Sequence, residues 1–170
     1  MDRAFRVGRF AGIQWNVHWT FLLFVGWVSA MQWLVNGFGS AMWEQVVFGG
    51  MVSICLVAHE LGHVLVGLQF GIQTQEITLL PTGGLSRSRE VSGDLWTELC
   101  IACAGPLVHV LIALGIAAVL AAQGNSLVVS SFGWIGTSAS DQFWQQMVFV
   151  NLSLATINLI PALPLDGGRV

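Results

Sequence analysis

The chain has 170 residues, of which 55% are hydrophobic and 9% are charged, and its mean hydropathy is +0.73. Soluble globular domains carry about 25% charged residues, and a chain this short cannot bury so much apolar surface away from water, so the composition excludes a soluble domain and indicates a membrane protein. The formal net charge is −3, and the six basic residues, all arginines, form no basic patch interleaved with aromatic side chains, which leaves nucleic-acid binding without support.

Four apolar stretches follow one another along the chain, and each is close to the ~20 residues that a helix needs to cross ~30 Å of hydrocarbon. They cover about residues 17–35, 43–70, 97–122 and 142–160. The basic N-terminal segment leads into a run long enough to span and lacks a convincing cleavage site, so we expect no cleavable signal peptide. The sequence therefore predicts an all-α polytopic membrane protein with four transmembrane helices, built as one membrane-embedded unit over residues 1–170.

The arginines predict the orientation of these helices. They lie before the first stretch, between the second and third, and after the fourth, whereas segments 36–42 and 123–141 contain no lysine or arginine. With four spans, all arginines then fall on one side of the membrane, which the positive-inside rule assigns to the cytoplasm. We therefore expect a multi-pass protein of the cell membrane whose N-terminus, 71–96 loop and C-terminus are cytoplasmic.

The 71–96 loop is expected to contain a short extended, β-like segment. Gln75 to Leu80 has the composition of a strand, Pro81–Gly84 is typical of a turn, and a second short extended piece is expected to follow. The fold class is thus all-α, with this small extended element between the second and third helices.

Three cysteines, Cys55, Cys100 and Cys103, lie in apolar surroundings. Their odd number argues against a disulfide framework, and no second pair accompanies the C-x-x-C spacing of the last two. We interpret all three as small packing residues.

The motif His59-Glu60-x-x-His63 interrupts the second apolar stretch. Residues four apart project from the same face of a helix, so the two imidazoles can bind one Zn²⁺ with Glu60 beside it. There the carboxylate can act as general base on a zinc-bound water and pass the proton to a leaving amine. The alternative is that these are buried polar residues satisfied by neighbouring helices. Three ionisable residues within five positions favour the metal site, because such groups are costly at membrane depth.

A catalytic zinc site usually has three protein ligands and an open position for water, so a third ligand must come from elsewhere. The candidates are Asp166, Asp141, Glu44, His18 and His109. Glu44 and Asp141 fall at predicted outer helix ends, far from the motif, and His18 is expected at the inner interface. Asp166 lies at the inner end of the fourth span, where a helix broken by two prolines can hold it at the depth of the histidines. Asp166 is therefore the preferred third ligand.

Several motifs together carry a resemblance to a known family. "AHELGH" stands on one membrane helix, "AGPLVH" on the next and "NLIPALPLDGGRV" after the fourth, while "VHWTFLL" and "PTGGLSR" extend the match over nearly the whole chain. In this order and spacing, the chain resembles the site-2 protease family of intramembrane zinc metalloproteases, peptidase family M50. Many relatives continue with further helices and soluble domains after the last motif, so we expect a membrane-embedded metalloprotease core, either complete or as one part of a longer chain.

The resemblance implies that His59, His63 and Asp166 bind one zinc ion per chain and that Glu60 is the catalytic glutamate. It also implies an endopeptidase that cleaves membrane-spanning protein substrates within the lipid bilayer. The alternative is a non-catalytic membrane zinc-binding protein or a metal transporter, although a transporter is expected to carry further polar residues along its other helices. An inactive scaffold is a third hypothesis, which the intact motif disfavours. The oligomeric state is left open.

Two further residues take roles from the same motifs. Asn158 matches the asparagine of the family's N-x-x-P-x-x-P-x-D-G pattern, and we assign it to orienting the substrate backbone or stabilising the oxyanion, with helix packing as the alternative. His109 stands where relatives often carry an asparagine after "AGP". We interpret His109 as a packing group or as a partner of a ligand, and not as a ligand itself.

The extended segment of the loop has a proposed use as well. A helical substrate is shielded from hydrolysis until it is unwound, and an extended edge near the active site can receive the unwound strand by backbone pairing. The candidate residues for this edge are Thr78, Leu80, Gly83 and Gly84. The alternative is an ordinary loop.

Overall fold

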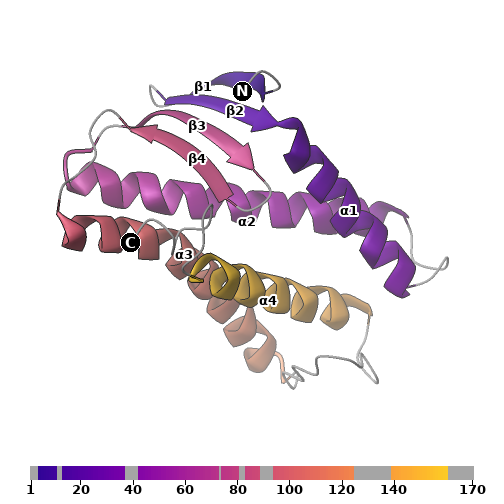
Figure 1. Ribbon diagram of the computed structural model, residues 1–170. Coiled ribbons are helices and arrows are strands. Elements are labelled where there is room, and N and C mark those ends of the chain that lie inside the picture. Colours follow the sequence, from indigo (N-terminus) through magenta and orange to yellow (C-terminus); the bar gives the residue numbers. More distant parts are fainter. Residues whose placement is uncertain are drawn as a thin grey trace.

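The computed structural model describes residues 4–10, 13–36, 42–72, 74–80, 83–88, 94–124 and 139–160. Two strands come first and are followed by two helices, two further strands and two final helices (Figure 1). In chain order these elements are β1 (Ala4–Phe10), β2 (Ile13–His18), α1 (Trp19–Asn36), α2 (Met42–Gln69), β3 (Thr74–Leu80), β4 (Gly83–Ser88), α3 (Leu95–Ala122) and α4 (Ala139–Asn158).

The four helices occupy the four apolar stretches, with ends that differ from the predicted ones by at most three residues. Within the described part of the chain, two helical segments are long and apolar enough to cross a membrane, Val46–Gln69 and Leu95–Ala122. The helices are therefore confirmed as helices. Length and composition support two of the four expected spans, α2 and α3.

The strands form one four-stranded sheet in the order β1-β2-β3-β4. β1 and β2 form an antiparallel pair, β3 and β4 form another, and β2 joins the two pairs by running parallel to β3. The sequence analysis missed the first pair and began the first span at Val17, which lies in β2. The signal was present, because apolar Ile13, Trp15 and Val17 alternate strictly with polar residues, as a half-buried strand requires.

The loop between α2 and α3 contains the two expected extended pieces as β3 and β4. The predicted turn at Pro81–Gly84 was too long, because Gly83 pairs with Leu80 and Gly84 pairs with Leu79 across the two strands. Both glycines therefore belong to β4, and residues 81 and 82 lie outside the described residues. Pairing across the sheet decides this boundary, and turn composition alone cannot locate it.

Helix α2 is the centre of the molecule. The sheet lies along one side of α2, while α3 and α4 lie on the other, and α1 crosses near its beginning (Figure 1). Ile77 and Leu79 of β3 are buried against α2 in the main apolar cluster, 0% and 6% exposed. The remaining buried members of this cluster are Phe21, Phe48, Val52, Cys55, Leu56, Val64, Met147 and Leu154. The middle of α2 is therefore flanked by the sheet and by α3 and α4.

Several polar side chains of the helices are buried in the protein, and many apolar side chains lie on its surface. On α4, the side chains of Gln145, Gln146, Asn151 and Asn158 are all buried, whereas leucines elsewhere on the helices are strongly exposed. Examples of such exposed leucines are Leu22, Leu23, Leu65, Leu107, Leu111 and Leu114. This distribution is unfavourable in water and is expected when the surroundings are hydrocarbon, where polar groups must find partners within the protein. The buried polar side chains of α4 also explain why this helix is less apolar than α2 and α3.

Candidate metal centre

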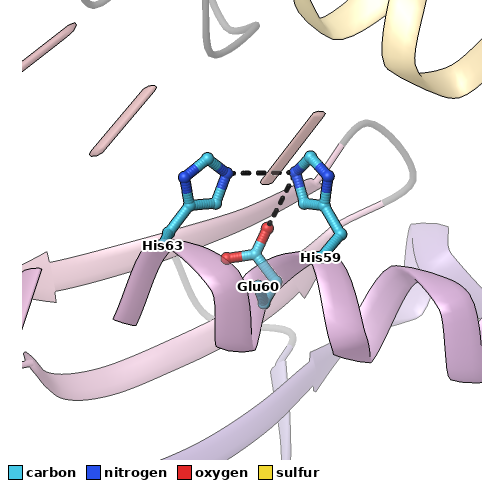
Figure 2. Close-up of side chains that lie close together, drawn as sticks. All are labelled: His59, Glu60 and His63. Carbon is cyan, nitrogen blue, oxygen red and sulfur yellow. Dashed lines mark hydrogen bonds and ion pairs between the residues drawn. The ribbon is translucent and has the colours of Figure 1, made fainter. Parts of the chain in front are cut away.

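His59, Glu60 and His63 come together on one turn of α2 (Figure 2). The Nε2 atoms of the two histidines are 3.1 Å apart, and Oε1 of Glu60 is 3.8 Å from Nε2 of His59. All three side chains are buried, with 0%, 1% and 6% of the residue exposed in chain order. The helical spacing in the sequence therefore produces the expected cluster, enclosed by the rest of the fold.

The donor set of this cluster fits a zinc ion. Two imidazole nitrogens on a tetrahedral zinc are about 3.3 Å apart, given Zn–N bonds of about 2.0–2.1 Å. The observed separation of 3.1 Å is close to this value. One ligand atom from each of the three residues lies within 4.8 Å of the other two, so a single ion can be reached by all of them.

The ring of His63 is oriented by the neighbouring helix. Its Nδ1 atom lies 2.6 Å from the backbone carbonyl oxygen of Ile101 in α3. A carbonyl oxygen can only accept, so Nδ1 donates, and in the neutral imidazole the lone pair is then on Nε2. Nε2 is also the atom that faces His59. This is the arrangement that metal-ligating histidines show, with the second ring nitrogen bonded to a carbonyl or carboxylate.

A glycine allows α3 to approach the two histidines. A Cβ atom added at Gly105 would lie 2.6 Å from Cε1 of His59 and 2.6 Å from Cε1 of His63. At the same crossing, a Cβ atom at Gly62 of α2 would lie 2.8 Å from Cγ2 of Val108. The "AGP" motif was recognised from the sequence, but this close approach requires the tertiary structure. Small residues at such crossings are typical of membrane helices.

His109 contacts the cluster and is fixed by a residue that the sequence analysis missed. Its ring centroid lies 4.8 Å from that of His59 at an interplanar angle of 37°. Its Nδ1 atom is 2.8 Å from Oδ1 of Asn151 in α4, and His109 and Asn151 are both 0% exposed. The sequence signal for Asn151 was an amide side chain within an apolar stretch, because polar residues inside a membrane are costly and usually functional. The prediction that His109 packs beside a candidate ligand agrees with this geometry.

Three other candidates for the third ligand, His18, Glu44 and Asp141, lie away from the cluster. His18 ends β2, where its Nδ1 atom is 2.7 Å from Oγ1 of Thr20, and Glu44 is exposed in the first turn of α2. Asp141 lies in the first turn of α4, at the end opposite to Asn158. Asp166 lies outside the described residues, so its predicted role as third ligand stays a prediction.

Asn158 is the last residue of α4 and is 1% exposed. Its Oδ1 atom accepts no hydrogen bond from the part of the chain that the structure describes. A buried amide oxygen without a partner is costly, and such groups often mark a site that binds something else. The predicted role of Asn158 in orienting the substrate or stabilising the oxyanion stays a prediction.

The substrate-strand residues divide between an inner and an outer strand. Thr78 and Leu80 lie in β3, which is bonded to β2 on one side and to β4 on the other. Thr78 pairs with Asn16 of β2 and with Leu85 of β4, so it offers no free edge. Leu80 pairs with Gly83 of β4, and its predicted part in strand addition stays a prediction. Gly83 and Gly84 lie in β4, which is the outer strand of the described sheet. Among the described strands, β4 is therefore one that has a neighbour on one side only.

The cysteines form no disulfide. Cys55 is buried in the core, with its Sγ atom 3.6 Å from Nδ2 of Asn151, while Cys100 is partly buried and Cys103 is exposed on α3. The packing role expected of all three fits Cys55 best.

Comparisons with known proteins agree with this site. The sequence model of peptidase family M50 matches residues 47–170. The chain is 35% identical to the Synechocystis sp. protein named "Putative zinc metalloprotease sll0528" and 31% identical to zinc metalloprotease MJ0392 of Methanocaldococcus jannaschii. Both matches cover the whole chain, which spans less than half of these relatives, 44% and 45% of their lengths.

A solved structure is similar as well. The fold matches the site-2 protease from Methanocaldococcus jannaschii with a TM-score of 0.70 and 29% sequence identity, over 98% of this chain and 68% of that one. The family match covers α2 from Val47 onward, both strands that follow it, α3, α4 and the final motif. The chain therefore belongs to peptidase family M50, the zinc metalloproteases to which the site-2 proteases belong.

Proposed function

We propose that this chain is the catalytic core of an intramembrane zinc endopeptidase that hydrolyses peptide bonds of membrane-spanning protein substrates. The observation that carries the proposal is the convergence of His59, Glu60 and His63 on one buried turn of an apolar helix. Burying three ionisable groups at membrane depth is costly, and a metal ion that binds them offsets this cost. The names of the relatives and the site-2 protease fold support the same reaction class.

The depth of the cluster supports cleavage within the bilayer. His59 and His63 stand ten and six residues before Gln69, the end of the apolar part of α2. At a rise of about 1.5 Å per residue, they lie about 15 Å and 9 Å from that end. A substrate bond reaching them must therefore enter the membrane-embedded part of the protein.

His59 and His63 would hold one zinc ion, and Asp166 would complete the set of three protein ligands. The zinc, when bound, supplies a Lewis acid that lowers the pKa of water and polarises the substrate carbonyl. The order of the motifs supports Asp166, because the segment that contains it follows directly after Asn158, the buried last residue of α4. Carboxylate oxygens of Asp or Glu are ordinary zinc ligands and complete catalytic sites that contain two histidines.

Glu60 acts as the general base in this proposal. Its carboxylate is on the same side of α2 as Nε2 of His59, and its buried position keeps it within reach of a water molecule beside the two histidines. Glu60 takes the proton from that water as the oxygen attacks the peptide carbonyl. It then delivers the proton to the nitrogen of the leaving amine, so the carboxylate is regenerated.

The substrate backbone would be held by Asn158 and by the outer edge of β4. The Asn158 amide can donate to the carbonyl oxygen of the bond under attack, where negative charge develops. The backbone of β4, beginning at Gly83 and Gly84, can pair with an unwound substrate strand. β4 contacts α2, so a strand added at this edge lies on the side of the sheet nearest the cluster-bearing helix.

The decisive experiment compares zinc content and cleavage for wild-type protein and two glutamate variants. Full-length protein in detergent is assayed against a tethered membrane-spanning substrate. The proposal requires that Glu60→Gln binds zinc and loses turnover by several orders of magnitude. Glu44→Gln, which changes an exposed carboxylate in the first turn of the same helix, is the matched control and keeps both properties.

The alternatives give different results. A non-catalytic zinc-binding protein or transporter binds zinc in all three forms and shows no turnover in any of them. An inactive scaffold shows neither property. Turnover that survives in Glu60→Gln would remove this residue from the reaction.

A further inference from the structure

We infer that His109 and Asn151 form a positioning pair that fixes the imidazole of His59 for metal binding. The inference rests on the proposed metal function of His59 and adds two residues from α3 and α4 to it. Within the described residues, the group of side chains that could hold a metal ion is His59, Glu60 and His63, and it includes neither His109 nor Asn151. Their effect is therefore exerted through His59.

The amide of Asn151 has one possible orientation. Its Nδ2 atom donates to the backbone carbonyl oxygen of Met147, at 2.8 Å, and also approaches Sγ of Cys55 at 3.6 Å. Reversing the amide would place its oxygen against the Met147 carbonyl oxygen, which is repulsive. Oδ1 must therefore face His109. Asn151 is 0% exposed, so bulk solvent does not reach these positions.

The orientation of Asn151 determines which nitrogen of the neutral His109 ring carries the hydrogen. Oδ1 of Asn151 can only accept, so Nδ1 of His109 donates to it over 2.8 Å. The neutral His109 ring then carries its lone pair on Nε2 and has a fixed plane, because rotation about its ring axis would break this bond. A histidine that is 0% exposed and held in this way is a rigid surface for its neighbour.

That neighbour is the ring of His59. The two ring centroids are 4.8 Å apart with an interplanar angle of 37°, while His63 meets His59 edge-on at 4.7 Å and 83°. His59 is thus contacted by two rings in different directions. His63 is oriented by the Ile101 carbonyl and His109 by Asn151, so both contacts of His59 come from rings that are themselves fixed.

The pair also ties three helices together at the level of the site. His109 belongs to α3, it contacts His59 of α2, and it is bonded to Asn151 of α4. α4 leads into the segment that contains Asp166. The same contact that orients His59 therefore also fixes the position of α4 relative to the two histidines.

The test measures metal affinity in full-length protein in detergent, with zinc by competition and with cobalt by its visible absorption spectrum. His109→Ala is expected to weaken binding of both ions by about 10- to 100-fold, the usual effect of removing a group that orients a ligand. Asn151→Ala is expected to weaken binding in the same direction and to alter the cobalt spectrum. Gln146→Ala, which removes another buried amide from α4, is the control and leaves both unchanged.

Two comparisons separate this role from a structural one. His109→Phe keeps a ring against His59 without the Nδ1 donor, so its affinity should fall between those of wild type and His109→Ala. The double variant His109→Ala/Asn151→Ala should bind no more weakly than His109→Ala alone, because Asn151 acts through His109.

The remaining outcomes overturn the inference in recognisable ways. Wild-type affinity and spectrum in His109→Ala and Asn151→Ala, even with lowered thermal stability, would make the pair a packing feature only. Effects that add in the double variant would show that Asn151 does not act through His109. His109→Phe as weak as His109→Ala would mean that the ring contact has no part. Wild-type protein that binds no metal would overturn the proposed function together with the inference.

Discussion

Gly105 of α3 lies so close to His63 of α2 that a methyl group at position 105 would be 2.6 Å from Cε1 of the His63 ring. Real side-chain carbons essentially never approach another heavy atom within 3.0 Å. The same methyl group would also be 2.6 Å from Cε1 of His59. The absence of a side chain on α3 is therefore a condition for the two imidazoles to occupy their observed positions.

Gly105→Ala should weaken zinc binding by at least about tenfold, because the added methyl group must displace one of the two ligand rings or separate the helices. The measurement is zinc affinity by competition with a chelating dye. Gly115→Ala on the same helix is the matched control, since a Cβ atom there meets nothing within 4 Å. Equal affinity in the two variants would contradict the close approach of α3 to the histidines.

Removal of the metal should lower the melting temperature of the protein. A ligand that binds only the folded chain stabilises it by RT ln(1 + [L]/Kd), which is about 2.7 kcal/mol when zinc is present at 100 times its Kd. A chelator should abolish this contribution, as measured by thermal unfolding in detergent. In His63→Ala, the chelator should have little effect. A shift as large as in wild type would locate the metal elsewhere.

The side-chain hydrogen bond between Asn16 of β2 and Glu76 of β3 should contribute measurably to the free energy of unfolding. Nδ2 of Asn16 donates to Oε1 of Glu76, and Asn16 is only 3% exposed. Asn16→Ala should cost about 1–3 kcal/mol, because the half-buried carboxylate of Glu76 loses its donor. Thermal unfolding of Asn16→Ala, Glu76→Ala and the double variant gives the coupling between the two side chains. Strictly additive effects would mean that the bond contributes nothing.

Strand addition at β4 can be tested with proline at two successive positions. Along an edge strand, backbone N–H groups point alternately toward the neighbouring strand and away from it, so Leu85→Pro and Ser86→Pro remove one group of each kind. The variant that loses the outward N–H should keep its zinc content and its thermal stability but cleave substrate more slowly. The variant that loses the inward N–H should be less stable. Unchanged cleavage in both would count against pairing of the substrate with this edge.

The membrane orientation is testable at the two ends of α3. Cysteines placed at Leu95 and at Gln123, both exposed, should react with an impermeant maleimide from opposite sides of the membrane, the first from the cytoplasm. The background should carry Cys100→Ala and Cys103→Ala, because neither side chain is fully buried. Labelling of both positions from one side would show that α3 does not span.

The features that could be predicted from the sequence are those that depend on residues close together in the chain. Apolar runs of the right length located all four helices, and the spacing of His59 and His63 placed both on one helical face, since both patterns depend on neighbouring residues alone. Asn151 and Gly105 could not be assigned in this way. Their importance lies in contacts with His109 and the two histidines, which residues on other helices supply.

The N-terminal strands show a different kind of failure. The alternation in Ile13–His18 is visible in the sequence, but it stands directly before an apolar helix, and the predicted span begins at Val17 and so includes the last two residues of the strand. The pairing of β2 with β1, and with β3 distant in the chain, keeps these residues extended. Local composition cannot show such a partner.

The parallel pairing of β2 with β3 also constrains how the chain assembles. Asn16 and Glu76 are 60 residues apart, and α1 and α2 lie between them. During synthesis, both helices emerge before β3 exists, so β1 and β2 have no strand to join until α2 is complete. The complete sheet can therefore form only after α1 and α2 have been synthesised. A chain interrupted before residue 74 would carry His59, Glu60 and His63 on a helix that still lacks its cover on one side.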